Sequence, residues 1–391
     1  MQAEIYIHIP FCVRKCLYCD FLSGAYSEDI RQQYVKALIN EISNSKWAGQ
    51  LTVPTIFIGG GTPSILPAKE IEAILDAIKS TFSVNIDAEI TMECNPGTVD
   101  KEKLEELHRI GINRLSIGLQ SANNDELKTL GRIHTYEEFV ETYNNARAAG
   151  YNNINIDIMN ALPGQTIDTY KDTLDKVITL SPEHISAYSL IIEEGTAFYE
   201  MYEEDELLRE RGERPNILPS EDEERQMDIL TEEYLHESGY ERYEISNYSK
   251  AGYECKHNIG YWIRENYLGF GIGAASLVNE KRYKNQGNIN KYIDEYLRMD
   301  GVIDKEDSYE ELMNLSKQEA MEETMFLGLR LIKGVDIKAY TTRFHIDPRV
   351  QYKDILDELI KDELITISDT HIALTRRGRD ISNYVMAKFI E

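Results

Sequence analysis

Three of the five cysteines of this chain lie close together, at Cys12, Cys16 and Cys19. Clustered thiols in a chain without secretory features hold a metal more often than they form disulfides. Three thiolates suit zinc, which then needs a fourth ligand, or an iron–sulfur cluster with one iron left open. No fourth cysteine continues the spacing, and Phe21 stands at the next position. The open cluster is therefore the favoured interpretation, and zinc completed by a distant His or Asp is the alternative.

Polar residues also mark the ends of several apolar, strand-like segments. Glu93 and Gln120 each close such a segment, and Asp157 lies inside another. A glycine run ending at Gly61 follows a strand directly, and its backbone N–H groups could receive a carboxylate. Each residue alone could be structural. Because ligands of parallel α/β sheets bind at the carboxyl ends of the strands, we expect these residues to gather beside the cysteines.

Residues 234–278 are unusually rich in tyrosine and glycine, and His257 lies in their midst. The aromatic residues expected around it are Tyr248, Tyr253, Tyr261, Trp262 and Phe270. An imidazole beside flat apolar faces is what haem binding requires. Taken alone, however, such a histidine is more often a core or surface residue. Cys255 would be a second soft ligand in the same segment, although a buried thiol is the commoner role.

The elements that must position these residues follow a regular alternation between residues 4 and 190. The predicted strands are 5–9, 55–59, 89–93, 114–120, 154–159 and 184–190. The predicted helices between them are 28–46, 68–81, 100–110, 136–149 and 167–180. Strand–helix repeats of this length predict a parallel sheet. Since a closed α/β barrel has eight units, six predict an incomplete (βα)6 barrel with one open side.

We expect three parts in the chain. Residues 1–235 would form the partial barrel with an acidic linker at its end, and 236–309 an aromatic, glycine-rich region. Residues 310–391 would form a helical, winged-helix-like module, with helices 318–331, 337–344, 350–361 and 376–390 and a strand pair 364–368 and 371–374.

The charge balance is strongly acidic, because 42 basic residues oppose 68 acidic ones and give a net charge of −26 at pH 7. Such a charge repels nucleic acid, so small molecules and proteins are the expected partners. The acidic runs within 191–236 are interpreted as a solvated linker and surface helices, with a docking surface for a basic partner as the alternative. With no signal core and no apolar run of about 18 residues, a cytoplasmic protein is expected.

Taken together, these motifs resemble radical S-adenosylmethionine (SAM) proteins, and within them the anaerobic coproporphyrinogen III oxidase branch. The resemblance rests on the cysteine spacing and on segments 7–12, 59–64, 93–97, 118–121, 131–134, 162–166 and 186–190. It implies that Cys12, Cys16 and Cys19 bind a [4Fe-4S] cluster whose open iron is chelated by SAM. It implies contacts to that SAM from Tyr6, Gly60, Glu93 and Ile191. A second SAM in the oxidase is held at positions that match Tyr18, Gly61, Thr62, Gln120, Arg132 and Asp157.

Two features depart from the oxidase pattern. Phe21 stands where the oxidase has a fourth cysteine, and Cys12 lies almost at the start of the chain, where the oxidase carries an N-terminal arm. Both features match the sister group, the haem chaperone family HemW, which carries an H-N-x-x-Y-W motif, here at residues 257–262. The resemblance implies that the chain binds haem through His257 and delivers it to respiratory haem proteins.

The same resemblance leaves several points open. It does not say whether SAM is cleaved, and a homodimer or a membrane contact made through a partner would be compatible with it. Two alternative functions stand beside the chaperone. One is the oxidative decarboxylation of coproporphyrinogen III to protoporphyrinogen IX by a SAM-derived radical, and the other is a zinc-stabilised interaction protein.

Overall fold

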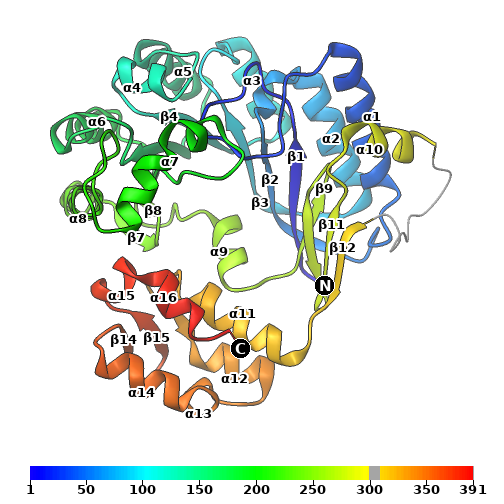
Figure 1. The fold of residues 1–391 in the computed structure, drawn as a ribbon. Coiled ribbons are helices and arrows are strands. Elements are labelled where there is room, and N and C mark those ends of the chain that lie inside the picture. Colours follow the sequence, from blue (N-terminus) through cyan, green and yellow to red (C-terminus); the bar gives the residue numbers. More distant parts are fainter. Residues whose placement is uncertain (299–308, 391) are drawn as a thin grey trace.

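The computed structural model describes residues 1–298 and 309–390. Within these residues the main body is a twelve-stranded sheet in the order β12-β11-β10-β9-β1-β2-β3-β4-β5-β6-β8-β7. Helices cover the outer face of this curved sheet, and a smaller module lies below its lower end (Figure 1). No helix of the described ranges combines the length and apolar character that a bilayer crossing requires.

The centre of the sheet consists of six consecutive parallel strands, as predicted. They are β1 (Glu4–Ile9), β2 (Thr52–Gly60), β3 (Ser83–Cys94), β4 (Arg114–Gln120), β5 (Ile154–Asn160) and β6 (His184–Ser189). The connecting helices are α1 (Glu28–Ser43), α2 (Ala68–Thr81), α3 (Lys101–Ile110), α4 (Asn124–Thr129), α5 (Tyr136–Ala148) and α6 (Ile167–Leu180), with a short 3-10 turn, η1 (Pro63–Ile65). The incomplete six-unit barrel is therefore confirmed.

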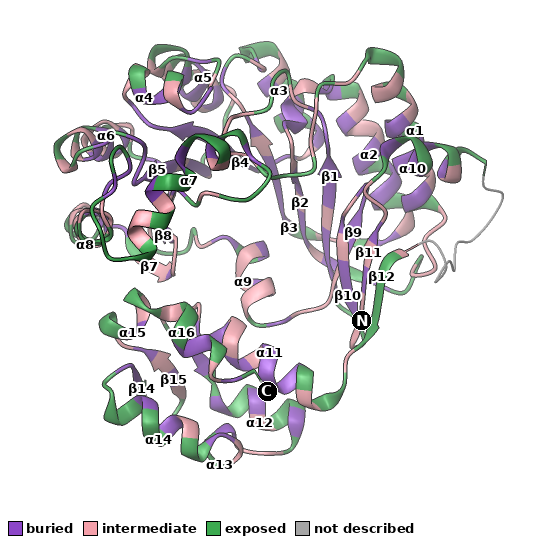
Figure 2. Ribbon diagram, viewed as in Figure 1, coloured by how far each residue is buried: buried purple, intermediate pink, exposed green. Residues whose placement is uncertain are grey.

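Residue alternation explains why these strands carry a site. Ile5, Ile7 and Ile9 on β1 are fully buried in the core shared with the helices. Successive side chains of a strand point to opposite faces, so Tyr6 and His8 face the inside of the barrel. Figure 2 shows the central strands as largely buried. The outer face of the sheet thus holds the fold together, and the inner face is left for polar groups.

Both edges of the sheet continue beyond the predicted strands. On the β1 side lie β9 (Tyr267–Phe270), β10 (Ala275–Val278), β11 (Lys281–Asn285) and β12 (Tyr309–Asn314), and β9 is parallel to β1. On the β6 side lie the antiparallel strands β8 (Asn247–Ser249) and β7 (Glu241–Glu244).

The glycines near residue 270 serve the packing of these edge strands. A Cβ on Gly269 would lie 2.2 Å from the carbonyl oxygen of Ala275, and one on Gly271 would lie 2.4 Å from the Tyr34 hydroxyl. The close approach that these glycines permit is therefore to other parts of the chain.

The acidic segment after β6 is largely helical, as the interpretation as surface helices predicts. It forms α7 (Ala197–Glu210) and α8 (Glu221–Glu237). Asp205 is buried, and its carboxylate accepts hydrogen bonds from the backbone N–H groups of Asn216, Ile217 and Leu218 at 2.7–2.8 Å. Three such bonds compensate the burial of a charge. At least this acidic residue is structural, which corrects the surface interpretation for it.

The C-terminal module has a hydrophobic core of its own. Its helices are α11 (Lys317–Gly328), α12 (Ile337–Phe344), α13 (Pro348–Gln351), α14 (Lys353–Lys361), α15 (Arg376–Asp380) and α16 (Ser382–Ala387). Its sheet has the order β13-β15-β14, formed by β13 (Val335–Asp336), β14 (Ile365–Ile367) and β15 (His371–Leu374). The helices followed by a strand ribbon confirm the winged-helix-like module, although two predicted helices are interrupted, at Tyr352 and at Ile381.

Two further helices complete the main body. They are α9 (Lys256–Trp262) and α10 (Ile289–Leu297). The division at residues 235 and 310 stays a prediction. Strands from 241–249 and 267–285 belong to the same sheet as the six parallel strands.

Candidate functional site

A cavity of about 340 Å³ lies at the carboxyl ends of the parallel strands. Cys12, Cys16 and Cys19 all line it from the loop that follows β1. The loop is anchored to the rest of the body, because the Cys12 N–H donates to the Gly24 carbonyl at 2.9 Å and the Leu17 N–H to the Leu130 carbonyl at 3.2 Å. Within residues 1–298 and 309–390, no three His, Cys, Asp or Glu side chains surround a single metal-ion position.

Two of the three thiols receive hydrogen bonds from side chains of the cavity wall. The Thr62 hydroxyl donates to Cys12 Sγ at 3.7 Å, and Arg132 Nη1 donates to Cys16 Sγ at 3.7 Å. Burial raises the pKa of Cys19. Hydrogen bonds to thiolate sulfur stabilise the charged form and tune any metal that it binds. The wall thus offers donors that favour the thiolate at Cys12 and Cys16, whereas burial disfavours it at Cys19.

Arg132 is the centre of the polar wall next to the cysteines. Its Nη2 donates to Asn95 Oδ1 and to the Gly118 carbonyl, both at 2.8 Å. Asn95 Nδ2 in turn donates to Thr62 Oγ1 at 2.8 Å. The buried Nε of Arg132 has no hydrogen-bond partner among the residues that the structure describes. A buried unpaired donor is costly, so this atom indicates the place of a ligand acceptor.

Glu93 and Gly60 form a second polar corner of the cavity. The Gly60 N–H donates to Glu93 Oε2 at 3.0 Å. Burial, and after it the nearby charge of Asp157, raises the pKa of Glu93 to about 7. Only glycine fits at position 60, because φ is 113° there and a Cβ would lie 2.6 Å from the His8 ring. A half-buried carboxylate that pairs with no cation in the described residues suits a ligand ammonium group.

The opposite wall is built on β4, β5 and β6. Asp157 accepts hydrogen bonds from Ser116 Oγ at 3.0 Å and from Asn155 Nδ2 at 2.7 Å, and burial raises its pKa. The Tyr188 hydroxyl donates to Gln120 Oε1 at 3.2 Å. This wall supplies several acceptors and hydroxyl groups, which suit the hydroxyls of a sugar or another polar ligand.

Most of the predicted site residues meet in this cavity. Besides the cysteines, its lining includes Tyr18, Gly60, Gly61, Thr62, Glu93, Gln120, Arg132, Asp157 and Ile191. The sequence interpretation missed Asn95, Ser116 and Tyr188. Asn95 directly precedes a Pro-Gly pair, which favours a turn, but it lies two positions after Glu93 and therefore on the same side of the strand.

Tyr6 lies deeper in the barrel than the other residues predicted to contact SAM. Its hydroxyl is 3.0 Å from His8 Nδ1, and it lines a separate cavity of about 310 Å³ together with Phe57 and His257. Its contribution to the SAM site stays a prediction.

His257 lies at the amino ends of the strands, opposite the cysteines. Its side chain is 1% exposed, its Nδ1 is 2.8 Å from Thr55 Oγ1 and its Nε2 is 3.2 Å from the Tyr261 hydroxyl. The ring stacks on Phe57 at 5.3 Å between centroids and meets Tyr261 edge-on at 4.9 Å. Among the aromatic residues predicted to surround His257, only Tyr261 contacts its ring in the described part of the chain. The sequence did not predict the contact with Phe57.

The surroundings of His257 keep it uncharged. Burial, together with the charge of Arg114, lowers its pKa to about 3. Glu4 Oε2 lies 3.9 Å from Nδ1, but burial raises the pKa of Glu4 to about 9, so both partners are neutral near pH 7 and the contact is not an ion pair. Burial also raises the pKa of Cys255 to about 12, which keeps that thiol protonated and disfavours it as a metal ligand.

Helix α9 is attached to the floor of the barrel through Glu89. The Glu89 carboxylate accepts hydrogen bonds from the N–H groups of Lys256 and His257, both at 3.3 Å, and from Cys255 Sγ at 3.6 Å. A carboxylate is favourable at the first turn of a helix. The motif helix is therefore held against the sheet by its amino end.

We expect the stability of the protein to fall as the pH is lowered from about 6.5 towards 3, in part because of His257. Its pKa of about 3 in the folded state lies below the ordinary value of 6.5, so the unfolded chain takes up a proton that the folded chain excludes. The contribution of neutral His257 to the free energy of unfolding is complete above pH 6.5. Below pH 6.5 it falls by about 1.4 kcal/mol per pH unit. Denaturant unfolding of wild type and His257→Gln between pH 7 and 4.5 measures this. Equal pH slopes would contradict it.

Comparisons with known proteins agree with one another. The model of the radical SAM superfamily matches residues 6–177, and that of the HemN C-terminal domain matches residues 315–381. The heme chaperone HemW of Bacillus subtilis is 35% identical over 387 residues, which cover 98% of either chain. HemW of Lactococcus lactis is 36% identical over 388 residues, which cover 98% of this chain and 96% of its own.

A solved structure has a similar fold. The coproporphyrinogen III oxidase HemN of Escherichia coli superposes with a TM-score of 0.82 at 22% identity, covering 99% of this chain and 89% of its own. At that identity the likeness shows a shared fold and carries no statement about activity.

Proposed function

We propose, because this chain belongs to the radical SAM superfamily and within it to the HemW family of haem chaperones, that it binds a [4Fe-4S] cluster, SAM and haem and delivers the haem to a respiratory haem protein. The observation that carries the proposal is the convergence of three thiols, a glycine corner and a half-buried carboxylate on one cavity at the strand ends. We propose the cytoplasm as the place of action.

The residues of this cavity fit the cluster and SAM. Cys12, Cys16 and Cys19 would hold three irons, and the side chain of Phe21, at the position of a fourth ligand, is 59% exposed and offers no donor atom. When bound, such a cluster supplies an iron with an open coordination position. The chain's own part is to place SAM there and to exclude water.

Individual side chains have separate tasks in this proposal. Glu93 and the backbone at Gly60 would receive the amino group of SAM, because the half-buried carboxylate forms no ion pair with a cation in the described residues. The unpaired Nε of Arg132 would donate to an acceptor of the ligand. Asp157, Gln120 and Tyr18 would complete the wall on the far side of the cavity.

Haem binding would involve the motif helix α9 at the other end of the barrel. In the structure both ring nitrogens of His257 are engaged, with Thr55 and with Tyr261. To ligate iron, the imidazole would have to leave both partners. Even without ligating iron, His257 would matter for haem, because its contacts fix the position of the helix on the sheet.

The test is a titration of the cluster-loaded protein with ferric haem under anaerobic conditions. We expect wild type to bind haem at one equivalent and His257→Ala to bind it at least tenfold more weakly. His236→Ala is the matched control, because that histidine is 68% exposed on α8 and lies outside the site, so wild-type affinity is expected. Absence of haem binding by wild type, combined with coproporphyrinogen III turnover, would refute the chaperone and support the oxidase.

A further inference from the structure

We propose that the haem lies in the cavity between α9 and the C-terminal module, with His371 as its iron ligand and Lys333 beside a propionate. The inference rests on the proposed haem-binding function and names the site for it. The cavity measures about 790 Å³, more than twice the volume of the one at the cysteines. This is within the range of small-molecule sites that bury most of a drug-sized ligand.

The two faces of α9 point to different places. Ile259, Trp262 and Ile263 line the large cavity, whereas His257 and Tyr261 line the smaller one inside the barrel. Residues three and four positions apart share a face of a helix, so this division follows from the helical repeat. One face of the motif therefore holds the helix on the sheet, and the other is available to a ligand.

The wall across from α9 is also apolar. It comes from the end of α11, from β13 and from α12, and it includes Leu331, Ile332, Val335, Ala339 and Tyr340. Two facing apolar walls with aromatic rings suit a flat, hydrophobic macrocycle. A highly charged ligand such as a nucleotide would leave these walls without a partner.

The cavity lining also contains charged side chains, with as many cations as carboxylates. The cations are Arg242, Lys333 and Arg343, and the carboxylates are Glu254, Glu265 and Asp336. Two of the cations already have anionic partners. Arg242 pairs with Glu232 at 2.9 Å and with Asp228 at 3.2 Å, and Arg343 pairs with Glu280 at 3.0 Å.

The cavity lining includes donors that are left for the carboxylates of a ligand, among them Lys333 and Trp262. Lys333 is exposed and forms no ion pair in the described part of the chain. The buried Nε1 of Trp262 has no hydrogen-bond partner there either. Haem combines a hydrophobic ring with two propionates, so it would pair with such donors while its ring contacts the apolar walls.

His371 is the histidine of this cavity and is free to bind iron. Its Nδ1 is 2.9 Å from Thr370 Oγ1, and its Nε2 has no hydrogen-bond partner among the described residues. A histidine that ligates a metal commonly forms a hydrogen bond through its other nitrogen. His257 differs in both respects, since it is 1% exposed and both of its nitrogens are engaged. In this arrangement His257 is a positioning residue.

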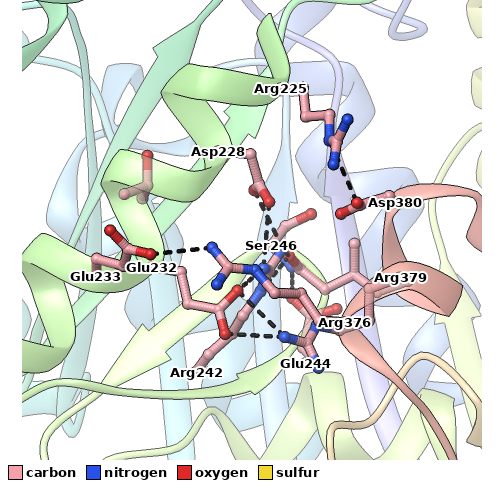
Figure 3. Close-up of polar contacts among 12 residues, drawn as sticks. Arg225, Asp228, Glu232, Glu233, Arg242, Glu244, Ser246, Arg376, Arg379 and Asp380 are labelled. Carbon is pink, nitrogen blue, oxygen red and sulfur yellow. Dashed lines mark hydrogen bonds and ion pairs between the residues drawn. The ribbon is translucent and has the colours of Figure 1, made fainter. Parts of the chain in front are cut away.

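Ion pairs fix the module that forms the second wall. Arg379 pairs with Glu232 of α8 at 2.8 Å, and Arg225 of α8 pairs with Asp380 at 3.4 Å (Figure 3). On another side, Arg264 Nε donates to Glu323 of α11 at 2.7 Å. Arg242 belongs to the group in Figure 3 and also lines the cavity, so the pairs that attach the module continue into the site.

The inference is tested with ferric haem and the full-length, cluster-loaded protein. His371→Ala is expected to weaken binding at least tenfold and to change the Soret band. Ala339→Trp, which fills the cavity from an exposed position of α12, is expected to weaken binding by a similar factor. Lys338→Trp, on the neighbouring position outside the cavity, is the matched control. His257→Ala is expected to bind weakly but to keep the wild-type Soret band, which an iron ligand could not do.

The outcomes separate the location from the function. If wild type binds haem while His371→Ala and Ala339→Trp bind it equally well with the same spectrum, the location is wrong and the chaperone proposal stands. A Soret band changed by His257→Ala and unchanged by His371→Ala would also overturn it. If wild type binds no haem, the proposed function fails first. Circular dichroism of each variant shows whether it is folded, and Ala339→Trp tests the cavity independently of His371.

Discussion

Cys16→Ala is expected to abolish the iron–sulfur cluster. The cavity offers three thiols, and a fourth protein ligand is not available to replace a lost one at position 21, where the side chain is phenylalanine. Arg132, which donates to Cys16 Sγ, would lose that acceptor as well. After anaerobic reconstitution we expect about four irons and four sulfides per chain in wild type and a loss of at least tenfold in the variant, as measured by iron and sulfide analysis and by absorption near 400 nm.

Cys255→Ala is the control for this experiment. That thiol is buried at the other end of the barrel, where burial keeps it protonated, and its removal leaves the cavity at the strand ends untouched. Wild-type iron and sulfide content is expected. Full cluster content in Cys16→Ala, or equal losses in both variants, would show that the three-cysteine assignment is wrong.

Gly61→Ala is expected to reduce both cluster content and SAM affinity by at least tenfold. The N–H groups of Gly61 and Thr62 donate to the carbonyls of Ile9 and Phe11 at 2.8 and 2.7 Å, so the glycine run is paired with the backbone that leads into Cys12. A Cβ at position 61 would lie 2.8 Å from the Phe11 oxygen and 3.0 Å from the Ile9 oxygen. Both contacts are with backbone, which cannot rotate away, so the two segments must separate. The cost in stability is about 1–3 kcal/mol.

Gly287→Ala controls for the loss of glycine flexibility. A Cβ there would meet Leu22 at 3.5 Å, an ordinary van der Waals distance, so wild-type values are expected. Binding of SAM by equilibrium dialysis and cluster content by iron analysis are measured on both variants, with a melting temperature for each. If Gly61→Ala and Gly287→Ala have the same SAM affinity, cluster content and melting temperature, the close packing of the glycine run against the cysteine loop is not needed for cluster or SAM binding.

The central sheet could be predicted because its signal is local. Strands such as β4, predicted at 114–120 and observed at Arg114–Gln120, consist of residues that are buried throughout. Helix α6 begins after the cap Thr166, whose side chain accepts from the Thr169 N–H. Long apolar strands alternating with capped helices leave few alternatives to a parallel sheet.

The edge strands could not be predicted in the same way. Strand β9 has four residues, one of them glycine, and it is defined by its pairing with β1 from the other end of the chain. The beginning of β3 was missed because its polar residues carry no apolar run, although it pairs with β2 from Ser83 onward. Pairing partners distant in sequence, rather than local propensity, decide such strands.

The candidate site was likewise predictable only where the signal is local. Glu93, Gln120 and Asp157 could be placed together because parallel strands end at one edge of a sheet. The position of His257 could not be deduced, since nothing in the residues around it says which face of α9 meets the barrel. That choice depends on Thr55 and Glu89, which belong to strands far away in sequence.

The cysteine cavity and helix α9 lie towards opposite ends of the same parallel strands, since on β2 Thr55 and Phe57 contact His257 whereas Gly60 lines the cysteine cavity. Under the proposed function, haem beside α9 and a cluster at the cysteines would occupy different cavities, so a protein that takes up haem beside α9 would leave the cysteine cavity covered. The two regions are linked through the barrel interior, because His8 lines the cavity of His257 and its ring packs at Gly60, which lines the cysteine cavity.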